Sequence, residues 1–240
     1  MVSGLNGLHE AVLDDDRVHR DHRHLGVESY YLYLHGFASG PKSAKAQYLC
    51  DRFTEADIPL YILDLNQGDF SHLTLTRQLQ QVQSFLPPSD IPVTIIGSSF
   101  GGLTAAWLAQ LCPQVKQIIT LAPAFGFLSH WLPKLGLETV QQWQNSGYLP
   151  VYHYAEQREI PLHYQFITDV QQYPEATLNR EIPTLLLHGI HDDVIPIQAS
   201  RTYCQNRPWT TLIELESDHT LGNVMPQIWQ EIKQFLEIGH

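Results

Sequence analysis

The sequence has few of the features that mark secreted, membrane or nucleic-acid-binding proteins. Its three cysteines are odd in number, widely spaced and never arranged as Cys-x-x-Cys, which argues against a disulfide framework. No hydrophobic run approaches the length of a membrane-spanning helix, and the N-terminus lacks the basic and apolar segments of a signal peptide. We therefore expect a cytoplasmic protein with no membrane span.

Basic residues are also scarce. Lysine and arginine together number 14 against 25 aspartates and glutamates, which gives a formal net charge of −11. This balance argues against nucleic acid or an anionic membrane as the main partner. The 240 residues show no internal repeat and suffice for one α/β domain with an insertion. The hydrophobic core of a domain of this size needs no disulfide bridges for stability. The sequence does not indicate an oligomeric state.

A short glycine-flanked serine motif is the most informative feature of the chain. Residues 97–101 read Gly-Ser-Ser-Phe-Gly, which matches the pattern G-x-S-x-G. The apolar run 91–96 before it predicts a buried strand, and the Ala-rich segment 103–111 after it predicts a helix. A serine on so sharp a strand-to-helix turn is a nucleophile elbow. The pattern makes Ser99 the nucleophile, and its glycines are expected where neighbouring chain would collide with a Cβ atom.

Candidates for a base and an acid follow the serine in the chain order of α/β-hydrolases. The apolar run 184–189 predicts a strand that ends shortly before Asp192 and Asp193, and the run 210–215 predicts a last strand before His219. An open α/β sheet places its active site at the carboxyl ends of its strands. We expect Asp192 to orient His219, with Asp193 as the alternative and the other aspartate capping a turn. An ordinary loop histidine is the competing interpretation of His219.

The loop after the first predicted strand has the composition of an oxyanion loop. Residues 30–34 predict a strand, and residues 35–41 continue as His-Gly-Phe-Ala-Ser-Gly-Pro. An oxyanion hole needs two backbone N–H groups, one from the residue after the nucleophile and one from this loop. We expect these donors to be Phe100 and Phe37. A tight Gly/Pro turn would explain the glycines alone, but not their coincidence with an elbow.

Two groups of motifs carry a family resemblance. The segments 33–46 (YLHGFASGPKSAKA) and 97–102 (GSSFGG) resemble the YqiA-like bacterial esterases. The segment 188–196 (HGIHDDVIP) and the Asp218-His219 pair are similar, more loosely, to the acyl-protein thioesterase and acyl-glucuronide esterase branch of the α/β-hydrolases. The likeness covers roughly residues 30–125 and 182–236. It implies a serine hydrolase acting on esters or thioesters, with a Ser99–Asp192–His219 triad.

The order of predicted elements gives the fold class and the domain boundaries. Strands alternate with helices, which predicts an α/β-hydrolase fold: a mostly parallel central sheet with helices on both faces. We expect a partly mobile N-terminal extension at 1–29 and a hydrolase domain at 30–240, with a lid inserted at about 126–182. The lid and the extension are departures from the smallest members of the resembled family.

A histidine-rich stretch lies in the N-terminal extension. His19, His22 and His24 suggest a metal site at first sight. The arginines between them would repel a cation, and no second cluster of ligands accompanies them. We therefore expect neither a metal nor any other cofactor.

The inserted segment is rich in aromatic residues and offers no clear strand to extend the sheet. Its place in the chain puts it over the carboxyl ends of the strands, and thus over Ser99. Its aromatic side chains either line an acyl pocket, bury the lid against the body, or do both. The residues expected to bind substrate are His35, Gly36, Phe125, Phe127 and Trp131.

Two lysines follow the oxyanion loop. Lys42 and Lys45 lie at the beginning of the next predicted helix, for which Ser43 is a plausible cap. A cation at this place would attract a substrate carboxylate or phosphate. Ordinary solvated helix lysines are the alternative.

These features together predict a serine hydrolase whose partner is a small-molecule ester or thioester. The expected reaction is cleavage of carboxylic esters with small to medium apolar acyl groups through an acyl-enzyme intermediate. An acyl thioesterase, acting on acyl-protein or acyl-CoA bonds, would use the same residues and is the first alternative. A non-catalytic α/β-hydrolase scaffold that binds a ligand is the second.

Overall fold

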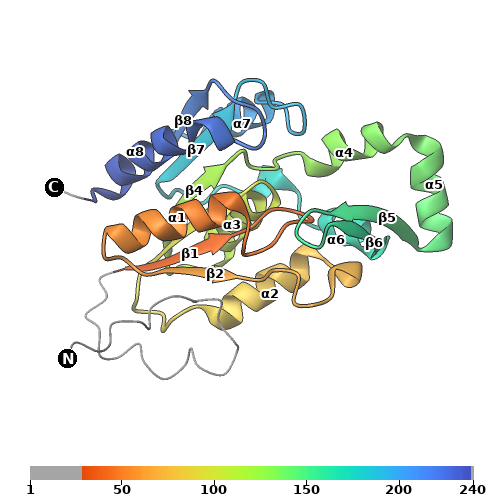
Figure 1. Cartoon of the computed structure of the whole chain (residues 1–240), viewed down its shortest axis with the longest axis horizontal. Helices are drawn as coiled ribbons and strands as arrows, with labels where there is room; N and C mark the ends of the chain where they lie inside the picture. The colour runs from red at the N-terminus through yellow and green to blue at the C-terminus, as the bar shows by residue number, and fades with distance from the viewer. Residues whose placement is uncertain (1–28, 239–240) are drawn as a thin grey trace, which may run out of the picture.

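The computed structural model describes residues 29–238 (Figure 1). The histidines at positions 19, 22 and 24, and nearly all of the expected N-terminal extension, lie outside these residues. Within the described part of the chain, no helix is both long and apolar enough to cross a membrane.

The core of the molecule is a six-stranded parallel sheet. Its strands are β1 (Tyr30–Leu34), β2 (Leu60–Leu63), β3 (Val93–Ser98), β4 (Val115–Leu121), β7 (Thr184–Gly189) and β8 (Thr210–Leu215). They lie in the order β2-β1-β3-β4-β7-β8, and every neighbouring pair is parallel. This confirms the predicted α/β-hydrolase fold and brings the carboxyl ends of all six strands to one edge.

Helices cover both faces of the sheet, because alternate side chains of a strand point to opposite faces. The covering helices are α1 (Ala44–Glu55), α2 (Leu75–Phe85), α3 (Phe100–Leu111), α7 (Gln198–Cys204) and α8 (Met225–Leu236). Tyr33 and Ile96 belong to a cluster with the buried residues of α1 and α8. Their neighbours Leu32 and Ile95 belong to the opposite cluster, with those of α2 and α3. Ser43 caps α1 as expected, since its side chain accepts a hydrogen bond from the Ala46 N–H.

The segment between β4 and β7 forms a small substructure of its own. Its elements are α4 (Phe127–Leu135), α5 (Leu137–Ser146), β5 (Tyr148–His153), β6 (Arg158–His163), α6 (Gln165–Val170) and the 3₁₀ turn η3 (Glu175–Thr177). The strands β5 and β6 pair only with each other, as an antiparallel hairpin. The sequence did not predict these strands. Pro150 and Pro161 lie opposite each other in them, and proline is unfavourable in a strand interior.

The inserted segment lies against the loop that follows β1. Figure 1 shows α4, α5 and the β5–β6 hairpin together at one end of the central sheet. The Tyr154 N–H, in the hairpin turn, donates a 2.8 Å hydrogen bond to the carbonyl of Ala38 in that loop. A Cβ atom on Gly40 would lie 3.1 Å from the Ala155 side chain. The insert therefore contacts the loop from which an oxyanion donor is expected.

Candidate active site

Ser99 occupies a strained turn between β3 and α3. Its backbone has φ 52° and ψ −117°, a conformation rare for a residue with a side chain. Backbone hydrogen bonds fix this turn: the Ser99 N–H donates to Leu121 O at 2.8 Å, and the Ser99 carbonyl accepts from Gly102 at 2.8 Å and Ala124 at 3.0 Å. Such strain is typical of a nucleophile elbow, which lifts the serine hydroxyl clear of the sheet.

The two glycines of the motif are needed for space. A Cβ atom on Gly97 would lie 2.3 Å from the carbonyl oxygen of Gly101, and one on Gly101 would lie 2.2 Å from that of Leu34. Both distances are far below any van der Waals contact, and the atoms met belong to the backbone. The predicted reason for these glycines is therefore confirmed.

Three polar side chains meet at the carboxyl edge of the sheet. His219 Nε2 lies 3.1 Å from Ser99 Oγ, and His219 Nδ1 lies 2.7 Å from Asp192 Oδ2. Because the carboxylate can only accept, Nδ1 carries the proton, and Nε2 is free to accept from the serine hydroxyl. Asp193, the alternative acid, is exposed and makes no side-chain hydrogen bond to His219. The geometry thus selects Asp192 as the partner of the imidazole.

Asp192 is held by four hydrogen bonds. Its Oδ1 accepts from the N–H groups of Val194 and Ile195 at 2.9 and 2.8 Å, and its Oδ2 accepts from His219 and from His188 Nε2 at 3.1 Å. Burial alone would raise the pKa of this carboxyl, but the hydrogen bonds from His188 and His219 hold the pKa well below its usual range. Asp192 is therefore ionised at any physiological pH.

His188 is a site residue that the sequence did not indicate. It is fully buried at the end of β7, where its Nε2 also lies 3.0 Å from the carbonyl of Ile195 and its Nδ1 lies 2.7 Å from Ser200 Oγ. Both partners of Nε2 are acceptors, so Nε2 carries the proton and Nδ1 accepts from the Ser200 hydroxyl. The only available signal was a polar residue at the end of an apolar strand, four positions before Asp192.

The loop with His219 is packed closely against the end of β7. A Cβ atom on Gly189 would lie 2.4 Å from the carbonyl oxygen of Ser217 and 2.5 Å from that of Asp218. The Asp218 carboxylate accepts from the N–H and the hydroxyl of Thr220, at 2.9 and 2.6 Å, and so closes the turn around His219. These contacts fix the imidazole relative to the sheet.

The two expected oxyanion donors border on Ser99. A Cβ atom on Gly36 would lie 3.2 Å from Ser99 Cβ and 3.8 Å from its Oγ, so the chain leading into Phe37 passes directly beside the nucleophile. Phe100 is the first residue of α3, where an N–H has no partner within the helix. Within residues 29–238, no hydrogen bond engages the N–H of Phe37 or Phe100.

His35 lies beneath this loop. It is 1% exposed, its Nε2 accepts the Leu65 N–H at 3.0 Å, and its Nδ1 lies 2.9 Å from the carbonyl of Gly36. With both ring nitrogens engaged inside the protein, His35 supports the loop from below. The expectation that His35 and Gly36 bind substrate stays a prediction, although Gly36 lies directly beside Ser99.

Aromatic side chains of the insert pack on both expected oxyanion residues. The rings of Phe37, Phe100, Phe127, Trp131 and Phe166 form one group, with centroids 5.1–6.3 Å apart. We call this group the lid cluster. Phe127 and Trp131 come from α4 and Phe166 from α6, so the insert packs aromatic rings on the two residues expected to form the oxyanion hole.

Phe125, the remaining expected substrate residue, lies apart from the lid cluster. It is buried and stacks on Tyr203 with ring centroids 3.9 Å apart. It borders a pocket of about 410 Å³ between the beginning of α4 and α7. Polar side chains that line this pocket include Ser129, His130, Glu175, Thr202 and Arg207. None of the three residues that meet at the sheet edge lines it.

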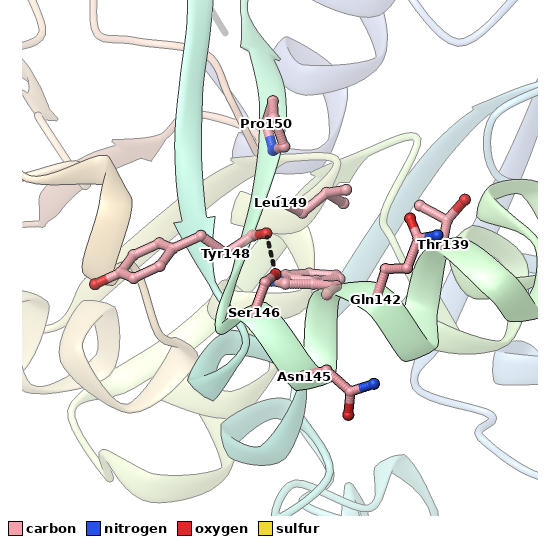
Figure 2. Close-up of a pocket in the computed structure, with 8 residues that line it drawn as sticks. Thr139, Gln142, Asn145, Ser146, Tyr148, Leu149 and Pro150 are labelled. Atoms are coloured by element: carbon pink, nitrogen blue, oxygen red, sulfur yellow. Dashed lines mark hydrogen bonds between the residues drawn. The ribbon is translucent and has the colours of Figure 1, made fainter.

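A second pocket, of about 530 Å³, lies between α5 and β5 (Figure 2). Its wall includes Thr139, Gln142 and Asn145, and Ser146 donates to the carbonyl of Tyr148 at 3.1 Å. Figure 2 shows Asn145 and the Tyr148 ring directed away from each other, so its polar groups do not converge on one point. No expected site residue lines it.

The described residues give no support for a metal centre. Between positions 29 and 238, no group of three or more histidine, cysteine, aspartate or glutamate side chains is arranged to hold a metal ion.

Comparisons with known proteins agree with this architecture. The profile of the "Uncharacterised protein family (UPF0227)" matches residues 30–237. A curated relative is the mitochondrial palmitoyl-protein thioesterase ABHD10 of Bos taurus, 24% identical over 179 residues, which are 70% of this chain. The match spans 58% of that relative's length.

Two solved structures share the fold over most of their length. Alpha/beta hydrolase domain-containing protein 10 from mouse superimposes with a TM-score of 0.72 at 20% identity, covering 89% of this chain and 91% of the other. Est1E from Butyrivibrio proteoclasticus, solved with ferulic acid bound, superimposes with a TM-score of 0.71 at 18% identity, with the same coverage of 89% and 91%.

Proposed function

This chain belongs to the uncharacterised protein family UPF0227, and we propose that it is a serine hydrolase of the α/β-hydrolase superfamily. Its substrates are carboxylic esters with small to medium apolar acyl groups. The observation that carries the proposal is the continuous hydrogen-bonded line from Ser99 Oγ through His219 to Asp192. A serine on a strained elbow, with free backbone N–H groups beside it, is otherwise difficult to explain.

The first half of the reaction forms an acyl-enzyme. Ser99 Oγ attacks the carbonyl carbon of the ester while His219 Nε2 takes the hydroxyl proton. The negative charge that develops on the carbonyl oxygen is stabilised by the N–H groups of Phe37 and Phe100. His219 then gives its proton to the departing alcohol oxygen, the C–O bond breaks, and the acyl group remains on Ser99.

The second half returns the free enzyme. His219 takes a proton from a water molecule as that water attacks the acyl carbon, and the same two N–H groups stabilise the second tetrahedral intermediate. The bond to Ser99 Oγ breaks, His219 returns the proton to it, and the carboxylic acid leaves. Throughout, ionised Asp192 keeps the proton on His219 Nδ1 and stabilises the imidazolium that forms twice.

The surroundings of Ser99 support an apolar acyl group. The lid cluster packs on Phe37, one of the proposed oxyanion residues, and an aromatic surface there favours alkyl or aryl groups over a sugar or a large polymer. Ferulic acid, bound to the structural neighbour Est1E, is an aryl acid of this class. Phe127 and Trp131, together with Phe37 on which they pack, are the proposed acyl-contacting residues, under a lid formed by residues of about 126–182.

An acyl thioesterase is the second candidate. The curated bovine relative is a palmitoyl-protein thioesterase, and a thioester uses the same nucleophile, base and oxyanion donors on a better leaving group. The net charge of −11 disfavours a polyanionic CoA ester. An acylated cysteine in a protein is the more suitable thioester on this ground.

Hydrolysis of a graded substrate series tests the proposal. Wild-type protein and Ser99→Ala are compared on p-nitrophenyl esters from acetyl to palmitoyl and on matched acyl thioesters. We expect activity on esters with short to medium chains, and its loss on the order of a million-fold in kcat in Ser99→Ala. Higher kcat/KM on thioesters than on esters would select the thioesterase. Wild-type protein that binds but hydrolyses none of these substrates would favour the ligand-binding scaffold.

A further inference from the structure

Lys45 joins the oxyanion loop to the loop that carries His219. It lies in the first turn of α1, the helix that begins directly after the oxyanion loop and is capped by Ser43. Its Nζ donates a 3.1 Å hydrogen bond to the carbonyl oxygen of Thr220, the residue after His219. The contact spans 175 positions of sequence, so it links two segments that only the fold brings together.

Two carboxylates act on the Lys45 ammonium group. Burial lowers its pKa to about 8, while the negative charges of Asp192, on the loop after β7, and Asp218, on the loop after β8, favour the protonated form. Lys45 is therefore mostly charged at pH 7, although partly buried. A cation is thus kept beside the Asp192–His219 pair, where Asp192 already accepts four hydrogen bonds.

Lys42, three residues earlier, provides the contrast. Its side chain is exposed, and no hydrogen bond or ion pair from it to another described residue is found. Of the two lysines, only Lys45 is directed at the His219 loop. Its amine already has a carbonyl partner and two compensating carboxylates, so a substrate anion would have to compete with them.

We propose that Lys45 is a positioning residue for the hydrolysis, which fastens the His219 loop to the helix behind the oxyanion loop through a hydrogen bond from its ammonium group. The inference rests on the proposed serine hydrolase function. Fastening matters because Ser99, His219 and the N–H of Phe37 come from three separate segments, and a misplacement of about 1 Å can cost about 100-fold in rate. The charge matters because a hydrogen bond donated by an ammonium group is stronger than one donated by a neutral amine.

Lys45→Met removes the charge and the donor at nearly constant length. We expect kcat for a neutral ester to fall about 10- to 100-fold with KM changed less than about threefold, since geometry and not binding is lost. Lys45→Arg should restore kcat, and Lys42→Met should leave both kcat and KM as in wild type.

Two further measurements make the outcome decisive. Labelling of Ser99 by a fluorophosphonate separates the two claims: an unlabelled and inactive wild type contradicts the hydrolase, whereas an active wild type matched by Lys45→Met contradicts only the role of Lys45. A rise in KM for anionic esters alone, with kcat unchanged, would make Lys45 a substrate-binding residue and overturn the proposal.

A fallback covers a Lys45→Met protein that does not fold. Wild type and Lys45→Arg are then compared between pH 7 and 9.5. Wild type should lose activity relative to Lys45→Arg above about pH 8, as Lys45 releases its proton and arginine does not. A constant ratio of the two activities across this range would contradict the proposed effect of the charge.

Discussion

At the scale of single residues, the chemistry of this site depends on which atoms carry protons. Asp192 accepts from two histidines and two backbone N–H groups and has no donor of its own. It therefore fixes the proton of His219 on Nδ1 and that of His188 on Nε2. His188 in turn accepts a hydrogen bond from the Ser200 hydroxyl. The chain of hydrogen bonds that begins at Ser99 therefore continues past Asp192 to a residue of α7.

Replacement of Asp192 by asparagine tests this arrangement. The amide is nearly the same size but has only one oxygen, so it cannot accept both from the backbone N–H groups at Oδ1 and from the histidines at Oδ2. With its oxygen toward the backbone, its NH₂ group faces the histidines, and His219 takes the wrong tautomer. We expect kcat to fall about 10³- to 10⁴-fold with KM nearly unchanged. Asp193→Asn, at the exposed neighbour, is the matched control. Equal losses in steady-state kinetics of the two variants would contradict the assignment of the acid.

At the scale of elements, the lid helix α4 is fastened at both ends. At its beginning, the Gly126 N–H donates to Glu175 Oε1 at 2.8 Å; near its end, Lys134 Nζ donates to the carbonyls of Asp193 and Val194. Between these ends, Phe127 and Trp131 contribute to the lid cluster. The position of the rings proposed to contact the acyl group thus depends on contacts to the loop that carries Asp192.

Glu175 makes the first of these contacts dependent on pH. Burial raises the pKa of its carboxyl from 4.5 to about 7, although the Gly126 hydrogen bond and Arg207 oppose the change. The folded protein therefore holds a proton that the unfolded chain releases, and the free energy of unfolding falls as pH rises from about 4.5 to 7.

Replacement of Glu175 by glutamine should remove this loss of stability at higher pH, while the amide oxygen still accepts from the Gly126 N–H. Glu175→Gln is expected to increase the free energy of unfolding at pH 8 by about 1–3 kcal/mol, since one pKa unit corresponds to about 1.4 kcal/mol, and to have little effect below pH 4.5. Urea unfolding at both pH values measures this, with the exposed Glu181→Gln as control. A variant less stable than wild type at pH 8 would show that the charged carboxylate stabilises the lid.

At the scale of the whole molecule, the lid and the body share one hydrophobic core. The cluster on the α2–α3 face of the sheet contains Phe100 and Trp107 of the body together with Phe127, Trp143 and Phe166 of the insert. Trp143 also donates its indole N–H to the carbonyl of Leu162 at 2.8 Å, which ties α5 to the hairpin. An insert held in this way has no separate core on which to fold alone.

We therefore expect cooperative unfolding in a single transition. Hydrogen exchange followed by mass spectrometry across a urea titration should give midpoints for peptides of α5 and of α8 that agree within about 0.3 M. Far-UV circular dichroism should give the same midpoint. An α5 midpoint well below that of α8 would mean that the lid opens as an independent unit.

The sequence predicted the parts of this site that local patterns define. The elbow around Ser99 needs only a strand, a helix and glycines in fixed positions, and His219 follows a strand end. The choice between Asp192 and Asp193 depends on how one turn directs two adjacent side chains, which composition does not determine. The contacts of Lys45 with Thr220 and of Glu175 with Gly126 join segments that are distant in the sequence, so no local sequence pattern predicts them.

The lid was the part least accessible to prediction. Its hairpin contains prolines in both strands and shows little alternation of apolar and polar residues, so pairing rests on packing against the body. The sequence did show that the insert is rich in aromatic residues, and it predicted the position of the insert at the carboxyl edge of the sheet. Which rings reach Phe37 and which, like Phe125, turn elsewhere follows only from the three-dimensional arrangement.

The identity of the nucleophile is the central claim, and covalent labelling tests it most directly. Wild type and Ser99→Ala are incubated with an alkyl fluorophosphonate. Mass spectrometry of the intact proteins then measures the added mass, and peptide mass spectrometry identifies the labelled residue. We predict that wild type gains one phosphonyl group, on Ser99, in parallel with loss of esterase activity, and that Ser99→Ala gains none. Label on Ser98 or another residue, or esterase activity that survives complete labelling of Ser99, would contradict the account.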